Sequence, residues 1–265
     1  MAVTPKSLDF EYNTPPVTEV VVSVQFEDIV GFNTIHFGAI AADFKEQGYT
    51  GYQETIPLPK VSLQGESVSP FLFNTSPFLP RVWFIKPEDS SLVQFQRDRF
   101  CFNWRKEQQK YPGYETIIGE FTKQYDVLLK AISKLKLPVP TINALELTYI
   151  NTIPTSEFGS LETVHNALQD INWKPKENLP APAHMQANFQ FLLKSDVQLY
   201  VNFSTAHRIN NKEKLLQMEQ RAVKQIKEST LDLHLQFEEA HNAIIYGFEG
   251  LLSETIKKKW GKKHA

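Results

Sequence analysis

Arginine and amide side chains recur at alternate positions in one short stretch of this chain, from Gln94 to Arg105. An amide both donates and accepts hydrogen bonds, and a guanidinium group presents a planar fork of donors that suits a carboxylate, a phosphate or the edge of a base. Residue types of this kind, in this pattern, predict recognition of a polar group. The candidate ligand-binding residues are Gln94, Gln96, Arg99, Asn103, Arg105, Glu146 and Thr148.

A β-hairpin is the element expected to position these residues, with two antiparallel strands joined by a tight turn at Arg97-Asp98. Side chains alternate between the two faces of a strand, so a two-residue turn determines which residues lie opposite one another. The expected cross-strand pairs are Gln96 with Arg99, Phe95 with Phe100, Gln94 with Cys101, Val93 with Phe102, and Leu92 with Asn103.

This register gives the hairpin one apolar face and one polar face. The apolar face is expected in the core and comprises Val93, Phe95, Phe100, Phe102 and Trp104. The polar face comprises Gln94, Gln96, Arg99, Cys101, Asn103 and Arg105. It is either a water-covered sheet face, which is common in antiparallel sheets, or a binding surface. Arg-Asp is not a favoured pair for a type I′ turn, and a longer loop would exchange the faces.

Two carboxylates, Glu19 and Glu146, are expected on strands that share this polar face. They are interpreted as ion-pair partners of Arg99 or Arg105, because charges on a sheet face usually pair or remain solvated. The alternative is catalytic: Glu146, Arg99 and Arg105 would serve a metal-dependent nuclease or a nucleotide hydrolase.

Other catalytic signals are weak. Cys101, the single cysteine, excludes an intramolecular disulfide, and no histidine is placed near it to activate a thiolate. His234 and His241 are seven residues apart, and core or interface packing is preferred to metal binding or acid–base work. No glycine-rich phosphate loop or HExxH pair occurs. The sequence therefore favours a protein without catalysis, cofactor or metal, and it identifies no catalytic residue.

Composition restricts the range of partners. The 265 residues carry a formal net charge of −2, so no overall basic field attracts long nucleic acid. The first residues contain no apolar signal segment, and no apolar run is long enough to span a membrane. A cytoplasmic protein without a membrane anchor is expected. The C-terminal lysines suit the carboxyl end of a helix.

The pattern along the whole chain predicts an α+β fold, with antiparallel sheet packed by long helices. Strands are expected over 17–26, 81–85, 92–96, 99–105, 144–150, 184–193, 197–203 and 215–226, and helices over 32–47, 114–135, 161–171 and 235–260. A helix is the alternative for 215–226. The first helix is expected to bury Ile35, Ala39 and Ala42, with Phe44 as a further candidate for the same face. The proline-rich stretch from Tyr49 to Pro80 is expected to be a loop packed on the body, or a lid.

Two halves repeat the order β-α-β-β-β-α, near 17–135 and 144–260, without residue-level identity. We expect closely packed halves at 1–140 and 141–265, and a single domain is the alternative.

Several segments together resemble one known family. They are Pro15-Pro16-Val17-x-Glu19-Val20, Gln94 to Phe100, Asn103-Trp104-Arg105, Tyr111-Pro112-x-Tyr114-Glu115, Glu146 to Asn151, and Ala240-His241-x-x-Ile244 followed by Phe248. In order and spacing they resemble TIGR04255, a sporadically distributed prokaryotic family. The resemblance implies no established activity, cofactor or catalytic residue. A patchy distribution suggests an accessory gene, such as one carried by a mobile or defence-related locus.

The favoured hypothesis is non-catalytic recognition of a protein partner or a small polar or anionic ligand by the polar face. Replacing Arg99 or Arg105 by alanine is expected to abolish binding without unfolding the protein. A structural subunit is the further alternative, in which a sheet edge or the helix containing Trp260 forms a homo-oligomer.

Overall fold

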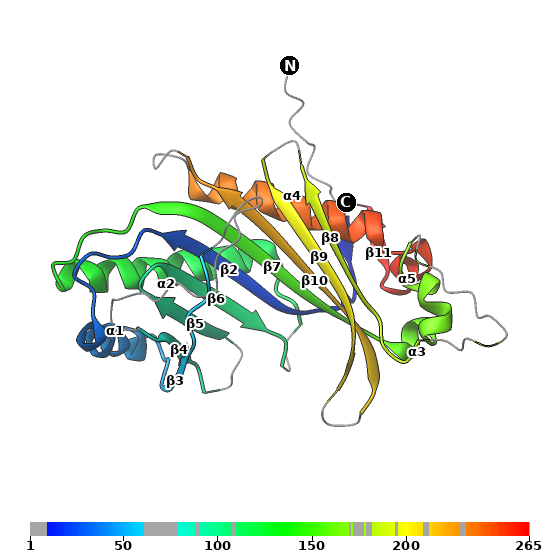
Figure 1. Ribbon diagram of the computed structural model, residues 1–265, viewed down its shortest axis with the longest axis horizontal. Helices are drawn as coiled ribbons and strands as arrows, with labels where there is room; N and C mark the ends of the chain where they lie inside the picture. Colours follow the sequence, from blue (N-terminus) through cyan, green and yellow to red (C-terminus); the bar gives the residue numbers. More distant parts are fainter. Residues whose placement is uncertain are drawn as a thin grey trace, which may run out of the picture. The chain divides into compact units, whose positions relative to one another are not determined.

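The computed structural model describes residues 10–60, 79–87, 91–107, 110–169, 171, 178, 182–193, 196–208, 212–227 and 232–264 (Figure 1). The fold is α+β, as the sequence predicts. Two compact units divide the chain. One comprises Met1–Thr18, Thr148–Ala222 and Glu238–Ala265, and the other comprises Glu19–Leu147 and Val223–Phe237. No helix in the described residues is both long and apolar enough to cross a membrane.

The described strands form an antiparallel sheet of nine strands in the order β3-β4-β5-β6-β2-β7-β10-β9-β8, and a second sheet of two strands, β1 and β11. Their bounds are β1 Phe10–Tyr12, β2 Val17–Phe26, β3 Gly51–Thr55, β4 Arg81–Ile85, β5 Ser91–Gln96, β6 Arg99–Arg105, β7 Ile142–Pro154, β8 Gln186–Leu192, β9 Gln198–His207, β10 Lys214–Gln225 and β11 Lys262–His264. The strand β3 lies in the stretch expected to be a loop. Residues 61–78, the rest of the expected lid, lie outside the described residues.

The hairpin of β5 and β6 confirms the predicted register, including the pairs Gln96–Arg99 and Leu92–Asn103. A type I′ turn needs a positive φ at both central residues. Arg97 and Asp98 are not among the described residues with a positive φ, so the turn is not type I′. Side chains hold it instead. Arg97 Nη2 lies 2.8 Å from Asp28 Oδ2, and Gln96 Nε2 donates to Asp98 Oδ1 at 2.6 Å. These contacts explain how a two-residue turn forms without glycine.

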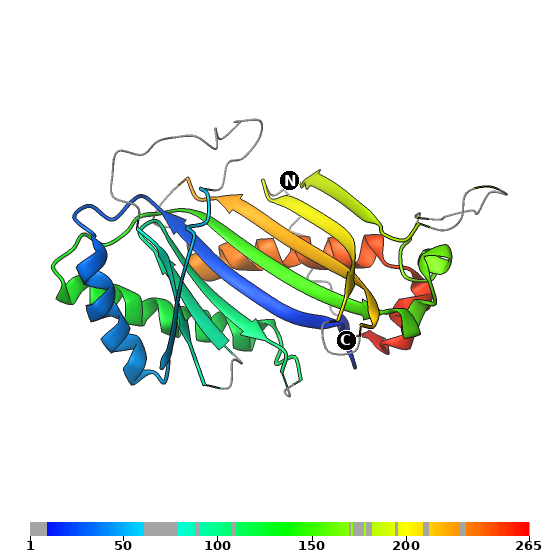
Figure 2. The ribbon, with the colours of Figure 1, turned by 60° about the horizontal axis from the view of Figure 1, so that its bottom comes forward.

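Helices α1 (Thr34–Glu46) and α2 (Tyr114–Lys134) cover the apolar face of this hairpin (Figure 2). Aromatic rings form the contact: Phe44 stacks on Phe84 at 5.0 Å, and Phe100 lies 5.9 Å from Phe121. The predicted core face of α1 is wrong except for Phe44. Ile35 is 79% exposed, whereas the helix buries its residues Phe37, Ile40 and Phe44. The larger side chains occupy the sheet-facing side because they bury more apolar area.

The other unit contains β8, β9 and most of β10, together with the short helix α3 (Thr155–Phe158) and the 3-10 helix η1 (Leu161–Asn166). The predicted long C-terminal helix is wrong in one respect, because it breaks at Leu252–Ser253 into α4 (Leu233–Leu251) and α5 (Glu254–Lys259). The hydroxyl of Ser253 caps α5 by accepting from Ile256 N at 3.3 Å. Lys257 to Lys259 do lie in the last turn of α5, as expected for basic residues.

Candidate functional site

The polar face of the hairpin is buried, so the expectation of a water-facing array is wrong. Gln94, Gln96, Arg99 and Asn103 are between 3% and 6% exposed. The remaining candidates are also withdrawn from water, with Thr148 at 7% and the side chains of Arg105 and Glu146 at 25% and 12%. Exposure was expected because one face of an antiparallel sheet is often solvated, and here other groups cover it.

Part of this cover is the backbone of residues Leu58 and Pro59. Gln96 binds Leu58 through both ends of its amide: Oε1 accepts from Leu58 N at 2.8 Å, and Nε2 donates to Leu58 O at 3.0 Å. Arg99 Nη2 donates to Pro59 O at 2.9 Å. The two candidate residues therefore bind the backbone of the protein's own chain.

Arg99 also contacts two other side chains on this face. Its Nη2 also donates to Gln25 Oε1 at 3.0 Å, and its Nη1 lies 3.6 Å from Glu146 Oε1. The predicted pairing of Glu146 with an arginine is therefore present. Gln25 in turn donates to Asn143 Oδ1 at 3.2 Å, which extends the network across neighbouring strands.

A second chain of polar contacts begins at Gln94. Gln94 Nε2 donates to Asn103 Oδ1 at 2.7 Å, and Asn103 Nδ2 donates to Glu19 Oε1 at 2.6 Å. Arg105 Nε lies 3.5 Å from the same carboxylate oxygen of Glu19. Since Glu19 and Arg105 are about one-quarter exposed, this end of the network reaches solvent.

Trp83 of β4 lies directly opposite Gln94 and belongs to the same face. Two guanidinium groups, those of Arg81 and Arg105, each lie 5.6 Å from the centre of its ring. Cation–π contacts of this geometry are favourable when the charge is desolvated. Burial also lowers the pKa of Arg81. Sequence reasoning missed Trp83 and Arg81, although the alternation of Arg81, Trp83 and Ile85 would have placed them on one face.

Three hydrogen-bonding atoms on this face have no partner among the described residues: Gln94 Oε1, Arg99 Nε and Trp83 Nε1. They come from adjacent strands, because Trp83 is opposite Gln94, and Gln94 is opposite Cys101, two residues from Arg99. A buried polar atom without a partner costs about 1–3 kcal/mol. The set offers two donors and one acceptor to a group that would satisfy them.

Cys101 lies within the same face and is not an activated nucleophile. Burial raises the pKa of its thiol to about 11, and this effect outweighs the opposing effect of the Arg99 charge. Its Sγ lies 3.3 Å from Ser23 Oγ, to which it donates. A thiol with so high a pKa stays protonated near neutral pH, which agrees with the inert role predicted for it.

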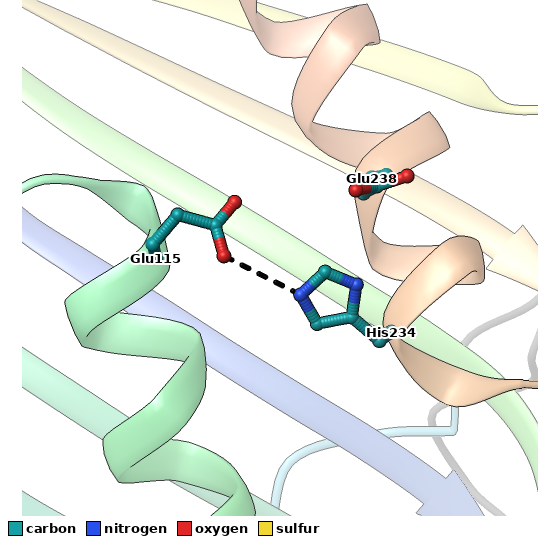
Figure 3. A group of neighbouring side chains, drawn as sticks. All are labelled: Glu115, His234 and Glu238. Atoms are coloured by element: carbon teal, nitrogen blue, oxygen red, sulfur yellow. Dashed lines mark ion pairs between the residues drawn. The ribbon is translucent and has the colours of Figure 1, made fainter.

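A separate group of side chains joins the start of α2 to α4. His234 Nε2 lies 3.4 Å from Glu115 Oε2, and Glu238 follows His234 one turn along α4 (Figure 3). Ligand atoms of the three lie within 4.8 Å of one another, although Glu115 and His234 are exposed. The spacing of His234 and Glu238 was the available sequence signal. His241 differs: burial lowers its pKa to about 4, and its ring lies 6.0 Å from that of Tyr149, which fits packing.

No model of a known protein family matches the chain, and no curated protein matches it. The resemblance to the TIGR04255 family therefore stays a prediction.

Proposed function

We propose that the polar face of β4, β5 and β6 binds a small polar or anionic ligand without catalysis. The observation that carries this proposal is the set of unpartnered atoms on Trp83, Gln94 and Arg99. Their chemistry defines the ligand class, because two donors select acceptor oxygens and the amide oxygen selects an N–H or O–H group. Small amides and nucleosides have both kinds of group, as do carboxylates and phosphate esters that also carry a hydroxyl or an amine.

Burial favours a small ligand over a protein partner. A protein partner contacts side chains that are exposed at the surface, whereas Arg99 and Gln94 are only 4% and 6% exposed. A small molecule needs to reach these atoms only from one side, and Glu19 and Arg105 provide a partly exposed polar border. Arg99 already has Glu146 as a counter-ion, so a neutral or singly charged ligand fits better than a highly charged one.

The test is a ligand screen by thermal shift and calorimetry, comparing Trp83→Phe with Trp104→Phe. Trp83→Phe removes an N–H that has no partner in the part of the chain that the structure describes, so the free protein should keep its stability while ligand affinity falls at least about tenfold. Trp104→Phe is the matched control, because Trp104 points to the apolar face of the same sheet. Binding lost equally in both variants, or no stabilisation of the wild type by any member of the panel, contradicts the proposal.

Three broader expectations remain part of this proposal. The order of elements supports a duplication of two halves, although four strands separate α1 and α2 and three separate η1 and α4 in the described residues. A cytoplasmic location agrees with the composition and the single buried cysteine. An accessory gene in a mobile or defence-related locus is what the family resemblance suggests.

A further inference from the structure

The strand β8 (Gln186–Leu192) ends the order of the nine-stranded sheet (Figure 1). Its neighbour in the described part of the chain is β9, with Gln186 opposite Ser204 and Leu192 opposite Gln198. Within the described residues, one side of β8 is therefore an edge of the sheet. The amides and carbonyls along such an edge can pair with another strand.

Two hydrogen bonds show which backbone groups of this strand point toward β9, and the remaining groups point to the edge. Thr205 N donates to Met185 O at 3.0 Å, and Leu193 N donates to Val197 O at 3.0 Å. In an antiparallel ladder, alternate residues direct both their N–H and C=O groups toward the partner strand. Met185, Leu193 and the odd-numbered residues between them therefore face β9. The residues whose N–H and C=O groups face outward are Gln186, Asn188, Gln190 and Leu192.

This edge lacks the features that prevent exposed strand edges from pairing with other chains. Natural edge strands are usually short, or carry charges, proline or bulges. β8 has seven residues, QANFQFL, with neither proline nor a charged side chain. The opposite edge of the sheet is different, since β3 has only five residues and carries the exposed Glu54. The same sheet therefore has one protected edge and one that is uncharged and long.

Apolar side chains on β8 also remain in contact with water. Phe189 and Phe191 are each 36% exposed and stack with ring centres 6.3 Å apart, and Leu192 is 63% exposed. Phe189 also contacts the buried Phe203 at 6.2 Å, which holds its ring in place. A fixed aromatic pair beside an unpaired strand edge is typical of an interaction surface.

We propose that β8 pairs antiparallel with β8 of a second copy of this chain, so that two sheets become continuous. In the register centred on Phe189, Gln186 lies opposite Leu192 of the second copy, and Asn188 lies opposite its Gln190. Every outward backbone group of the strand is then paired. The amide of Asn188 meets that of Gln190 and Phe189 meets its own equivalent, so the strand pairs with itself about a two-fold axis and brings no like charges together.

The test places charges at the facing positions 188 and 190. Asn188→Lys with Gln190→Lys puts lysines opposite lysines, whereas Asn188→Lys with Gln190→Glu puts lysines opposite glutamates. Both pairs of substitutions remove the same amides, including the contacts of Gln190 with Gln198 and Tyr200 at 3.3 Å, so their effects on the monomer are matched. Sedimentation over a range of concentrations measures the dimer.

The wild type is expected to dimerise, the doubly lysine variant to be monomeric, and the lysine–glutamate variant to dimerise at least about tenfold more tightly than the lysine variant. A wild type that stays monomeric overturns the proposal, as does dimerisation that is equal in the two variants. If the lysine variant does not fold, hydrogen exchange of the wild type decides. The outward amides of Asn188 and Gln190 should become protected as concentration rises, and unchanged exchange overturns the proposal.

Discussion

Arg99 and Glu146 form an ion pair in the interior of the sheet, with Nη1 3.6 Å from Oε1 and side chains only 5% and 12% exposed. The pair makes Arg99 part of the fold as well as part of the candidate site. Removing one member of a buried ion pair leaves the other charge buried without a counter-ion, which costs more stability than losing a surface pair.

Arg99→Ala should therefore lower the free energy of unfolding by about 3–5 kcal/mol. This revises the expectation that it would leave stability unchanged. Arg105→Ala should cost less, about 1 kcal/mol, because its side chain is one-quarter exposed. Urea denaturation measures both. The double variant Arg99→Met with Glu146→Leu should recover part of the lost stability. If Arg99→Ala alone lowers the free energy of unfolding by less than about 1 kcal/mol, the ion pair contributes little to stability.

Cys101 should react slowly in the folded protein. Its thiol pKa rises from an ordinary 9.0 to about 11, so the thiolate fraction near pH 8 falls roughly a hundredfold. Alkylation by iodoacetamide, followed by mass spectrometry, should be at least that much slower in native protein than in guanidinium. Equal rates in the two states would mean that Cys101 is accessible and ionisable.

Protein stability should fall on acidification partly through His241. Its pKa is about 4 in the folded protein against an ordinary 6.5, because burial disfavours the charged imidazolium. The unfolded chain therefore binds more protons between these values. The contribution to stability is complete above about pH 6.5 and is lost as pH falls to about 4, and it amounts to about 3 kcal/mol.

The measurement compares urea denaturation of the wild type and His241→Phe from pH 7 to about pH 4. Carboxylates titrate in both proteins, so the difference between them isolates the histidine. The wild type should lose more stability than the variant over this range. Parallel curves would place the titration of His241 close to its ordinary value in the folded protein.

Two glycines of α4 should respond in opposite directions to substitution by alanine. A Cβ at Gly247 would lie 2.7 Å from Leu199 Cδ2 and 2.8 Å from Gln220 Nε2, whereas one at Gly250 would meet no atom within 4 Å. Gln220 is fully buried and donates to Ile244 O at 2.9 Å, so it cannot move without losing a hydrogen bond. Gly247→Ala should destabilise by about 1–3 kcal/mol.

The second substitution is the control. Gly250→Ala places a methyl group on an exposed turn of the same helix and should stabilise by up to about 1 kcal/mol, because alanine favours the helical conformation. Thermal and urea denaturation measure both variants. If Gly247→Ala is as stable as Gly250→Ala, the helix does not approach Leu199 and Gln220 this closely.

Alternation was enough to predict most of the strands and the register of the hairpin, although β1, β3 and β11 were missed. It placed Gln94 opposite Cys101 and the phenylalanines on one face, because the period of two leaves little freedom once the turn is located. The same rule does not say what covers a face. The hydrogen bonds of Gln96 to Leu58 join residues 38 positions apart, and nothing in the local pattern of either residue indicates them.

Helix faces were harder to predict than strand faces. Ile35 and Ala39 have helical spacing, but Phe37, Ile40 and Phe44 have it too, and only the aromatic surface of the sheet decides between the two stripes. Similarly, Ser253 and Leu252 interrupt a helix pattern that is continuous in sequence. Tertiary packing of this kind regularly overrides local preference.

The most direct test of the proposed site is the nuclear magnetic resonance signal of the indole N–H of Trp83. Trp83→Phe identifies this signal by its loss, and Trp260 is an internal control because its Nε1 donates to Glu157 Oε2 at 2.5 Å. Titration with a ligand that stabilises the protein should shift the Trp83 indole signal and leave that of Trp260 unchanged. A stabilising ligand that moves neither signal, or moves only that of Trp260, would contradict binding at the unpartnered atoms of the polar face.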